Sequence, residues 1–210
     1  MGKRQDEALK TRQKLIEAVN ALVEEKGYNE IRIEEITEKA EVAKGTFYVY
    51  FKRKEDLIAA ATFEKFDIFK RESLEVSGGI EVQIAYFLKR STELIEEGSL
   101  ARAQQWLRSG VAPLEEDSIV AAKLKYDREF IEECICRAVE MSKLRKSTPV
   151  EKLAVQIVSQ YYGSLCLWCI SNGKISMQRL IDDFCSMHLA RLFDKYQNKN
   201  RKLKSKERRE

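Results

Sequence analysis

The stretch from Ile31 to Leu57 constrains the fold of this 210-residue chain more than any other. Its apolar residues repeat at helical spacing on both sides of a short break at residues 41–43. The repeating positions are Ile33, Ile36 and Ala40 before the break, and Thr46, Phe47, Tyr50 and Phe51 after it. Two amphipathic helices joined by about three residues form a helix-turn-helix, and we predict that motif here.

The second helix of this motif, predicted over residues 44–50, needs support from its neighbours. Isolated helices shorter than about 12 residues are marginal in water. Phe47 and Phe51 can face supporting helices, which leaves the polar side chains of the helix pointing outward. No acidic residue lies between Val42 and Lys54, whereas four cations do: Lys44, Lys52, Arg53 and Lys54. Together with the positive end of the helix dipole, these cations favour phosphate as a partner.

About twenty positions of residues 12–57 agree, in order and spacing, with a known pattern. They include Gly27-Tyr28, Ile36, Ala40, Val42, Lys44-Gly45-Thr46-Phe47-Tyr48, Tyr50-Phe51, Lys54-Glu55 and Leu57. The stretch resembles the DNA-binding domain of the TetR family of bacterial transcriptional regulators. It departs from that family at Arg32, Glu41 and Ala43, where the family usually has capping hydroxyls or a turn glycine.

The resemblance implies that the second helix enters the major groove of DNA. We expect Tyr48 and Lys54 to contact phosphates, and Lys44, Thr46 and Tyr50 to lie nearer to base edges. The full set of expected DNA-binding residues is Arg32, Lys44, Gly45, Thr46, Tyr48, Tyr50 and Lys54. Glu41 occupies a turn position that commonly requires a left-handed backbone, so we predict a positive φ there.

Helical periodicity continues through the rest of the chain and predicts an all-α fold. The expected helices cover Ala8–Lys26, Lys54 to about Val76, Ile80–Glu97, Leu100–Arg108, Glu115 to about Lys143, Thr148–Asn172 and Ser176–Tyr196. We expect a helix-turn-helix DNA-binding domain at 1–57, a larger helical ligand-binding and dimerisation domain at 58–196, and a basic, disordered tail at 197–210. Thr148, Pro149 and Glu151 read as the capping box of their helix.

The last predicted helix is apolar over more than half of its circumference, so it needs two neighbours. One is the body of the same chain, and the other is most simply a second copy. We therefore predict a homodimer built from the last two helices, packed as a four-helix bundle. The expected interface residues are Tyr161, Leu165, Trp168, Leu180, Phe184 and Met187.

Aromatic residues recur through the predicted body helices. Ordinary core packing explains such a pattern, and so does the lining of a ligand cavity between helices. Trp106 and Arg108 stand beside a break at Gly110, where an anionic or aromatic molecule could be admitted and oriented. The expected ligand-binding residues are Phe66, Phe87, Trp106, Arg108, Tyr126, Phe130 and Tyr162.

The composition argues against several other functions. The single histidine, His188, rules out a histidine-dependent triad within one chain. Cys166, Cys169, Cys185 and His188 could bind zinc on paper, but we expect the fold-back of the two helices to separate them, so we predict no metal and no cofactor. We expect no secretory signal and no membrane span, because the longest nearly unbroken apolar stretch, 161–170, is half of what a span needs. These features favour a cytoplasmic protein.

Net charge contributes little to the argument for DNA binding. Residues 1–57 hold 12 Lys and Arg against 12 Asp and Glu, so the argument rests on where the cations lie. We predict a sequence-specific regulator whose partners are double-stranded DNA, a second copy of itself and an unidentified small molecule. The expected form is a homodimeric repressor released by that ligand. The alternative is a helical protein-binding adaptor, or an enzyme, that retains the fold.

Overall fold

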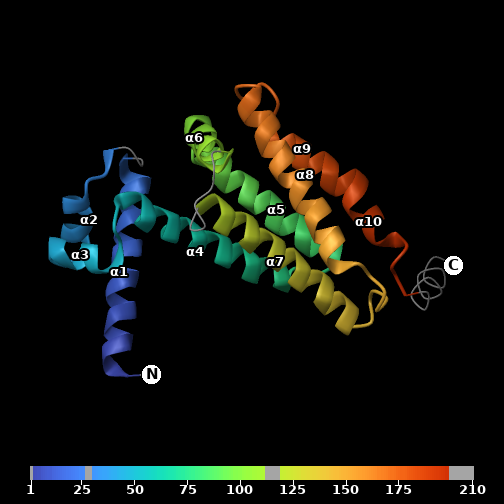
Figure 1. Cartoon of the computed structure of the whole chain (residues 1–210), viewed down its shortest axis with the longest axis horizontal. Coiled ribbons are helices and arrows are strands. Elements are labelled where there is room, and N and C mark those ends of the chain that lie inside the picture. Colours follow the sequence, from blue (N-terminus) through green and yellow to red (C-terminus); the bar gives the residue numbers. More distant parts are fainter. Residues whose placement is uncertain (1, 27–29, 112–118, 199–210) are drawn as a thin grey trace. The chain divides into compact units, whose positions relative to one another are not determined.

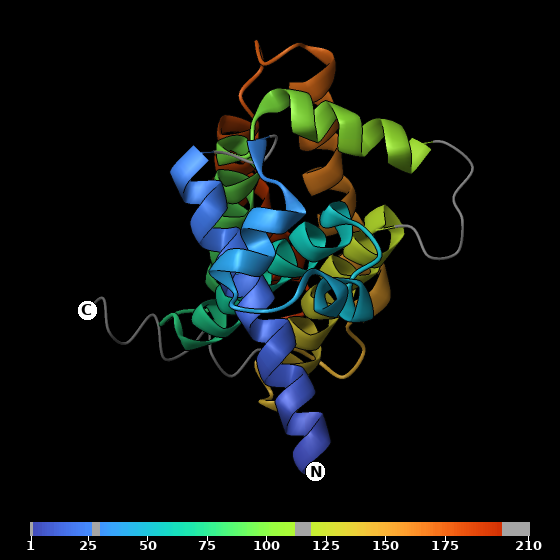
Figure 2. The ribbon, with the colours of Figure 1, turned by 90° about the vertical axis from the view of Figure 1, so that its left-hand side faces the viewer.

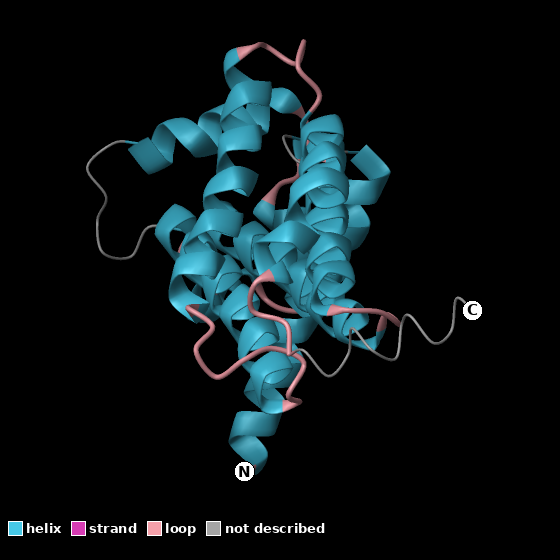
Figure 3. Ribbon diagram, turned by 90° about the vertical axis from the view of Figure 1, so that its right-hand side faces the viewer, coloured by secondary structure: helices cyan, strands magenta, loops and turns pink. Residues whose placement is uncertain are grey.

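The computed structural model describes residues 2–26, 30–111 and 119–198, and every regular element within them is a helix (Figures 1 and 3). The helices are α1 (Lys3–Lys26), α2 (Ile33–Lys39), α3 (Lys44–Tyr50), α4 (Lys54–Glu75), α5 (Ile80–Glu97), α6 (Leu100–Val111), α7 (Ile119–Glu140), α8 (Val150–Ile170), α9 (Met177–Phe184) and α10 (Ala190–Asp194). The predicted all-α class is confirmed. The chain forms two compact units that divide after Ile68, within α4, and not at the expected residue 57.

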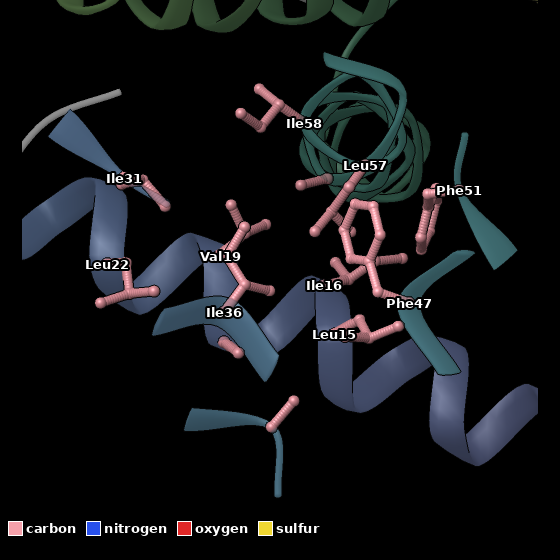
Figure 4. Close-up of a cluster of buried hydrophobic side chains, with 13 residues drawn as sticks. Leu15, Ile16, Val19, Leu22, Ile31, Ile36, Phe47, Phe51, Leu57 and Ile58 are labelled. Carbon is pink, nitrogen blue, oxygen red and sulfur yellow. The ribbon is translucent and has the colours of Figure 1, made fainter. Parts of the chain in front are cut away.

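The N-terminal unit packs α2 against α1, and α3 against α2 (Figures 1 and 2). Its core places Phe47 of α3 between Leu57 of α4 and the α1 residues Leu15 and Ile16 (Figure 4). All four side chains are completely buried. Each fully buried large apolar side chain contributes roughly 1.5–3 kcal/mol relative to exposure, so this anchoring supplies the support that the seven-residue α3 lacks on its own.

In the C-terminal unit, α7 packs against α5, α6 and α8, and α9 lies against α5 and α8. Figure 1 shows α8 and α9 side by side at one edge of this unit. A five-residue π turn, Cys185–Leu189, joins α9 to α10, so the last predicted helix is continuous but locally unwound. The last described residues lie along the α7–α8 loop, where Leu144 and Gln197 form an isolated antiparallel bridge.

Several helix ends differ from the expectation. Thr148 does not cap α8, because its Oγ1 donates to the carbonyl of Arg145 and Pro149 takes the N-cap position without a side-chain bond. Gly110 does not break α6, which runs on to Val111. Three expected features lie outside the described residues: the acidic start of α7 at residues 115–117, Gly27-Tyr28, and most of the basic tail, residues 199–210.

By length and composition, α8 could cross a membrane, and it is the one helix in the described part of the chain that could. Half of its most apolar window is buried inside the protein. The core helix of a globular protein passes the same test, so its apolar character is explained by packing against α7 and α9.

Candidate nucleic-acid interface and ligand-binding core

The turn between α2 and α3 has the backbone that its position demands. Glu41 has a φ of 56°, which confirms the predicted left-handed conformation. The amide of Val42 donates to the carbonyl of Thr37 at 2.9 Å, and the amide of Glu41 donates to that of Glu38 at 3.0 Å. These two bonds form a Schellman motif, in which the left-handed position normally belongs to glycine. The motif ends α2 and sets the direction in which α3 starts.

The start of α2 is capped by its own third residue. Glu35 accepts a hydrogen bond from the backbone amide of Arg32 at 2.8 Å, which supplies the carboxylate half of a capping box whose hydroxyl half is missing. Glu35 also accepts a hydrogen bond from Lys26 of α1. The bonds from Lys26 and from the Arg32 amide lower the pKa of Glu35. The guanidinium of Arg32 is not used in the cap, and this residue is exposed.

The start of α3 has a bare cap and a paired cation. Ala43 is the N-cap residue and forms no side-chain bond. Lys44, the first helical residue, donates from Nζ to Glu34 of α2 at 2.5 Å. This hydrogen bond raises the pKa of Lys44 and lowers the pKa of Glu34. Residues 42–54 contain no acid, but in the folded unit Glu34 of α2 lies beside Lys44 and neutralises its charge.

The outward face of α3 is formed by Gly45, Tyr48 and Val49. Tyr48 is 51% exposed and Val49 is 76% exposed. Thr46 is half-buried, and Tyr50 is partly buried against the N-terminal core. Val49 was not among the expected residues, although the sequence held a signal for it: position 49 lies two residues after the buried Phe47, which places it on the opposite side of α3.

Lys54 has a structural role in the free protein. Its Nζ donates to the backbone carbonyl of Ile31 at 2.9 Å, and the side chain is half-buried. This bond ties the first turn of α4 to the segment that precedes α2. The neighbouring Arg53 is exposed and pairs with Asp56 at 3.2 Å, and Lys52 is exposed. The expected DNA-binding residues thus gather on or next to α3, with Arg32 at the start of α2.

A second polar and aromatic cluster lies inside the C-terminal unit. The rings of Phe87 and Phe130 are 4.6 Å apart, and those of Trp106 and Tyr162 stack at 6.0 Å. Lys70 lies over the Tyr126 ring at 4.7 Å. Five of the seven expected ligand-binding residues therefore lie in these contacts, which come from α5, α6, α7 and α8.

The centre of this cluster is an ion pair that sequence analysis missed. Lys123 and Asp127, one turn apart on α7, form a salt bridge with side chains only 7% and 2% exposed. The Tyr162 hydroxyl donates to the second oxygen of Asp127 at 3.0 Å. Burial lowers the pKa of Lys123, and the charge of Asp127 opposes that effect. A Lys and an Asp four residues apart gave a helical ion-pair signal, but such pairs normally lie at the surface.

Two expected ligand-binding residues do not join the cluster. Phe66 is buried within α4 but belongs to the N-terminal unit, where its ring lies 6.4 Å from that of Phe63. Arg108 is exposed, and its Nε donates to the carbonyl of Gln104 on its own helix at 3.3 Å. Arg108 is therefore occupied on α6.

Comparison with known proteins places the N-terminal unit in a family. The family model for bacterial regulatory proteins, tetR family, matches residues 15–61. The helix-turn-helix domain belongs to the TetR family. The matched residues include the buried anchors of α1, the Schellman turn and all of α3, which are the features that position the outward face of α3.

Similar proteins extend over nearly the whole chain. The fatty acid metabolism regulator protein of Bacillus subtilis (strain 168) is 22% identical over 185 residues, which cover 86% of this chain and 95% of that protein. The crystal structure of the transcriptional regulator FadR from Bacillus subtilis in complex with stearoyl-CoA has a TM-score of 0.56 at 20% identity, covering 87% of this chain and 97% of that one. A TetR-family transcriptional regulator from Cytophaga hutchinsonii has a TM-score of 0.56 at 15% identity, covering 92% and 98%. The C-terminal unit thus shares the fold of these regulators.

The outer surface of α8 and α9 differs from the predicted interface. Tyr161, Leu165, Trp168 and Phe184 are buried within the protomer, so these four side chains are not available at the surface, whereas Leu180 is half-buried and Met187 exposed. The apolar residues that α8 does expose are Val155, Leu167 and Ile170, with Gly163 between them. Four of the six expected interface side chains thus point into the protomer, and the pairing of α8 and α9 with a second copy stays a prediction.

The cysteines and His188 do not form a metal site in the described part of the chain. No group of three or more His, Cys, Asp or Glu side chains within these residues is placed to hold an ion. Burial raises the pKa of Cys185 to about 11, so its thiol stays protonated near neutral pH. Cys134 and Cys169 are buried in the C-terminal unit, where they pack as small apolar side chains.

Proposed function

We propose that this protein is a homodimeric, cytoplasmic DNA-binding transcriptional regulator, a repressor that a small molecule releases. The observation that carries the proposal is the exposed face of α3, Gly45, Tyr48 and Val49, held on a TetR-family domain by the buried Phe47. A helix presented in this way fits the major groove of DNA. The ordered buried core behind it gives the helix the rigidity that base reading requires.

The DNA contacts divide into positioning and reading contacts. Tyr48 and Lys54 bind phosphates, while Thr46, Tyr50 and the backbone at Gly45 lie nearer to base edges. Lys44 exchanges Glu34 for a phosphate or a base on binding, which is inexpensive because the pair is exposed. Val49 adds an apolar contact of the kind that recognises a thymine methyl group. Arg32 reaches phosphate from the start of α2.

The dimer forms through the outer faces of α8 and α9, which pair with those of a second copy. Val155, Leu167 and Ile170 expose apolar surface on α8, Met187 does so in the π turn that follows α9, and Gly163 allows close approach of the two backbones. Two recognition helices at a fixed separation read two half-sites in successive major grooves. Ligand binding in the C-terminal unit releases the operator by favouring a separation that no longer matches.

The relative from Bacillus subtilis, whose crystal structure holds stearoyl-CoA, supports a ligand in the C-terminal unit. Acyl thioesters of coenzyme A are therefore the first ligands to test for release. An adaptor or an enzyme that had kept the fold would not bind the operator. DNA binding consequently separates the proposed function from both alternatives.

The test measures, by fluorescence anisotropy, how tightly the full-length chain binds the DNA upstream of its own gene. The affinity of the Tyr48→Phe variant for the same DNA is measured for comparison. Removing the hydroxyl assigned to phosphate should weaken binding about 10-fold, because hydrogen bonds to charged groups contribute roughly 1.5–3 kcal/mol. Tyr86→Phe on α5 is the matched control and should bind like the native chain. If the native chain binds all DNA sequences equally and weakly, the proposal of a sequence-specific regulator is refuted.

A further inference from the structure

The C-terminal unit contains a buried ion pair, which the packing of an apolar core does not require. Lys123 and Asp127 are almost completely inaccessible, so both charges are desolvated. Replacing such a pair by apolar residues of similar volume is often neutral or stabilising. The stability of a helical core does not require such a pair, so a different reason for holding charge there has to be sought.

Two unsatisfied hydroxyls lie in the same interior. Ser91 Oγ and the Tyr161 hydroxyl lie beside each other but form no hydrogen bond of normal geometry, although their residues are only 0% and 3% exposed. The Tyr161 ring lies 5.7 Å from that of Tyr162, which binds Asp127. Burial and the charge of Asp127 raise the pKa of Tyr161, so its hydroxyl stays protonated as a donor. Buried hydroxyls without partners are uncommon, and an acceptor from a ligand would satisfy them.

Two lysine side chains lie against the aromatic rings of this interior, and one of them is paired with a carboxylate. Lys70 lies 4.7 Å from the Tyr126 ring and Lys123 lies 5.7 Å from it. Asp127 is the carboxylate that pairs with Lys123. Trp106, Tyr126 and Tyr162 are only half-buried, so they form the boundary between the buried charges and the surface. The lysine ammonium groups and the hydroxyl donors thus lie in the interior of the C-terminal unit, and the half-buried rings of Trp106, Tyr126 and Tyr162 separate them from the surface.

We propose that the cluster of Lys123, Asp127, Tyr161 and Tyr162, here called the Lys123 cluster, binds an organic carboxylate. The carboxylate of the ligand pairs with Lys123 and accepts a hydrogen bond from Tyr161, and its apolar body packs on Trp106 and Tyr162. This inference rests on the proposed function, because it names the ligand class of the same unit. An acyl thioester has no free carboxylate on its acyl chain, so the two ligand classes are distinguishable.

Isothermal titration calorimetry of the full-length chain tests the proposal. The ligands are decanoate and benzoate, and each is compared with its neutral amide. Decanoyl-CoA is titrated as the competing ligand class. At least one acid should bind about 10-fold or more tightly than its amide, the ratio given by one charge-assisted hydrogen bond. Binding should also change the fluorescence of Trp106, a change that Trp106→Phe removes. Equal affinity for acid and amide, or no binding of either acid, would overturn the proposal. Binding of decanoyl-CoA alone would overturn the carboxylate while leaving a ligand-controlled regulator.

A double variant, Lys123→Met with Asp127→Leu, locates the site. It leaves no buried charge unpaired, and the Tyr162 hydroxyl that loses its acceptor costs less than one unpaired buried charge would, so the variant should still fold while losing the preference for acid over amide. The matched control is Lys125→Met with Glu129→Leu, an exposed pair of the same spacing on the same helix, which should keep the preference. If the double variant of the buried pair still binds acids more tightly than amides, the carboxylate does not bind at the Lys123 cluster. Operator binding without ligand is measured separately, so failure of the proposed function is recognised independently.

Discussion

Replacing Glu41 by glycine should stabilise the N-terminal unit. Glu41 has a φ of 56°, a conformation that costs a residue with a Cβ roughly 1–2 kcal/mol and costs glycine almost nothing. Both backbone bonds of the Schellman motif use main-chain atoms, so the substitution keeps them. The side chain is exposed, so little packing is lost. Glycine also increases the entropy of the unfolded chain by an amount equivalent to about 0.4–1 kcal/mol. The net gain is therefore on the order of 0.5 kcal/mol.

The assay is a thermal melt followed by far-ultraviolet circular dichroism. A gain of about 0.5 kcal/mol raises the melting temperature by roughly 2–4 °C if a unit of 60–100 residues unfolds alone, and by about 1–2 °C if the whole chain unfolds together. The carboxylate itself borders a surface hollow of about 250 Å³ that also contains charged side chains. The hollow is lined by Lys14, Glu17, Ala18, Lys39, Ala40 and Glu41.

Glu41→Ala therefore serves as the control. It removes the same charge but keeps a Cβ in the left-handed conformation, so it should melt below Glu41→Gly. The difference between the two variants isolates the backbone term from the electrostatic one. If Glu41→Gly melts at or below Glu41→Ala, the left-handed conformation carries no strain and the argument fails.

Three further predictions concern DNA binding and assembly. Val49→Ala should weaken binding to the operator several-fold, since about 1 kcal/mol of apolar contact is lost, and should leave non-specific binding and the melting temperature unchanged; equal losses on all DNA would refute base reading. Lys54→Gln should weaken all sequences alike and lower the slope of log affinity against log salt by about one unit, and an unchanged slope would restrict Lys54 to its bond within the unit. Ile170→Asp should give monomers in sedimentation because that side chain is 82% exposed on α8, whereas Met141→Asp, also exposed, should not; a dimeric Ile170→Asp would place the interface elsewhere.

Local signals made the helix-turn-helix predictable. The bounds of α3 and α5 agree with the sequence pattern, because Phe47 and Ile84 each belong to an unbroken apolar repeat. The left-handed Glu41 follows from the motif alone, since the turn allows few other backbones. Helix ends with two competing local bonds were less predictable. Thr148 could cap α8 or bond back to Arg145, and only the path of the α7–α8 loop decides between them.

Side chains that face distant partners could not be placed from the sequence. The apolar arc of the last predicted helix predicts two neighbours, but it does not say which side packs against the body of the same chain. Tyr161 and Trp168 took the inner side, which left Leu167 and Ile170 outside. The Lys123 cluster depends on Tyr162, 35 residues from Asp127 along the chain. A periodicity argument assigns charged residues to the surface and therefore misses such a pair.

The two candidate sites use the same chemistry under opposite conditions of solvation. Lys44 and Glu34 form an exposed pair in which solvent screens the attraction, so a phosphate can replace Glu34 at small cost. Lys123 and Asp127 form a buried pair, and separating them without another carboxylate would leave two unpaired charges in the interior. Exchange at the first site is therefore easy and selects little beyond negative charge, which suits a DNA backbone. At the second site Lys123 keeps Asp127, and a ligand carboxylate can only share the ammonium group with it, which demands a fixed geometry and suits the specific recognition of a small molecule.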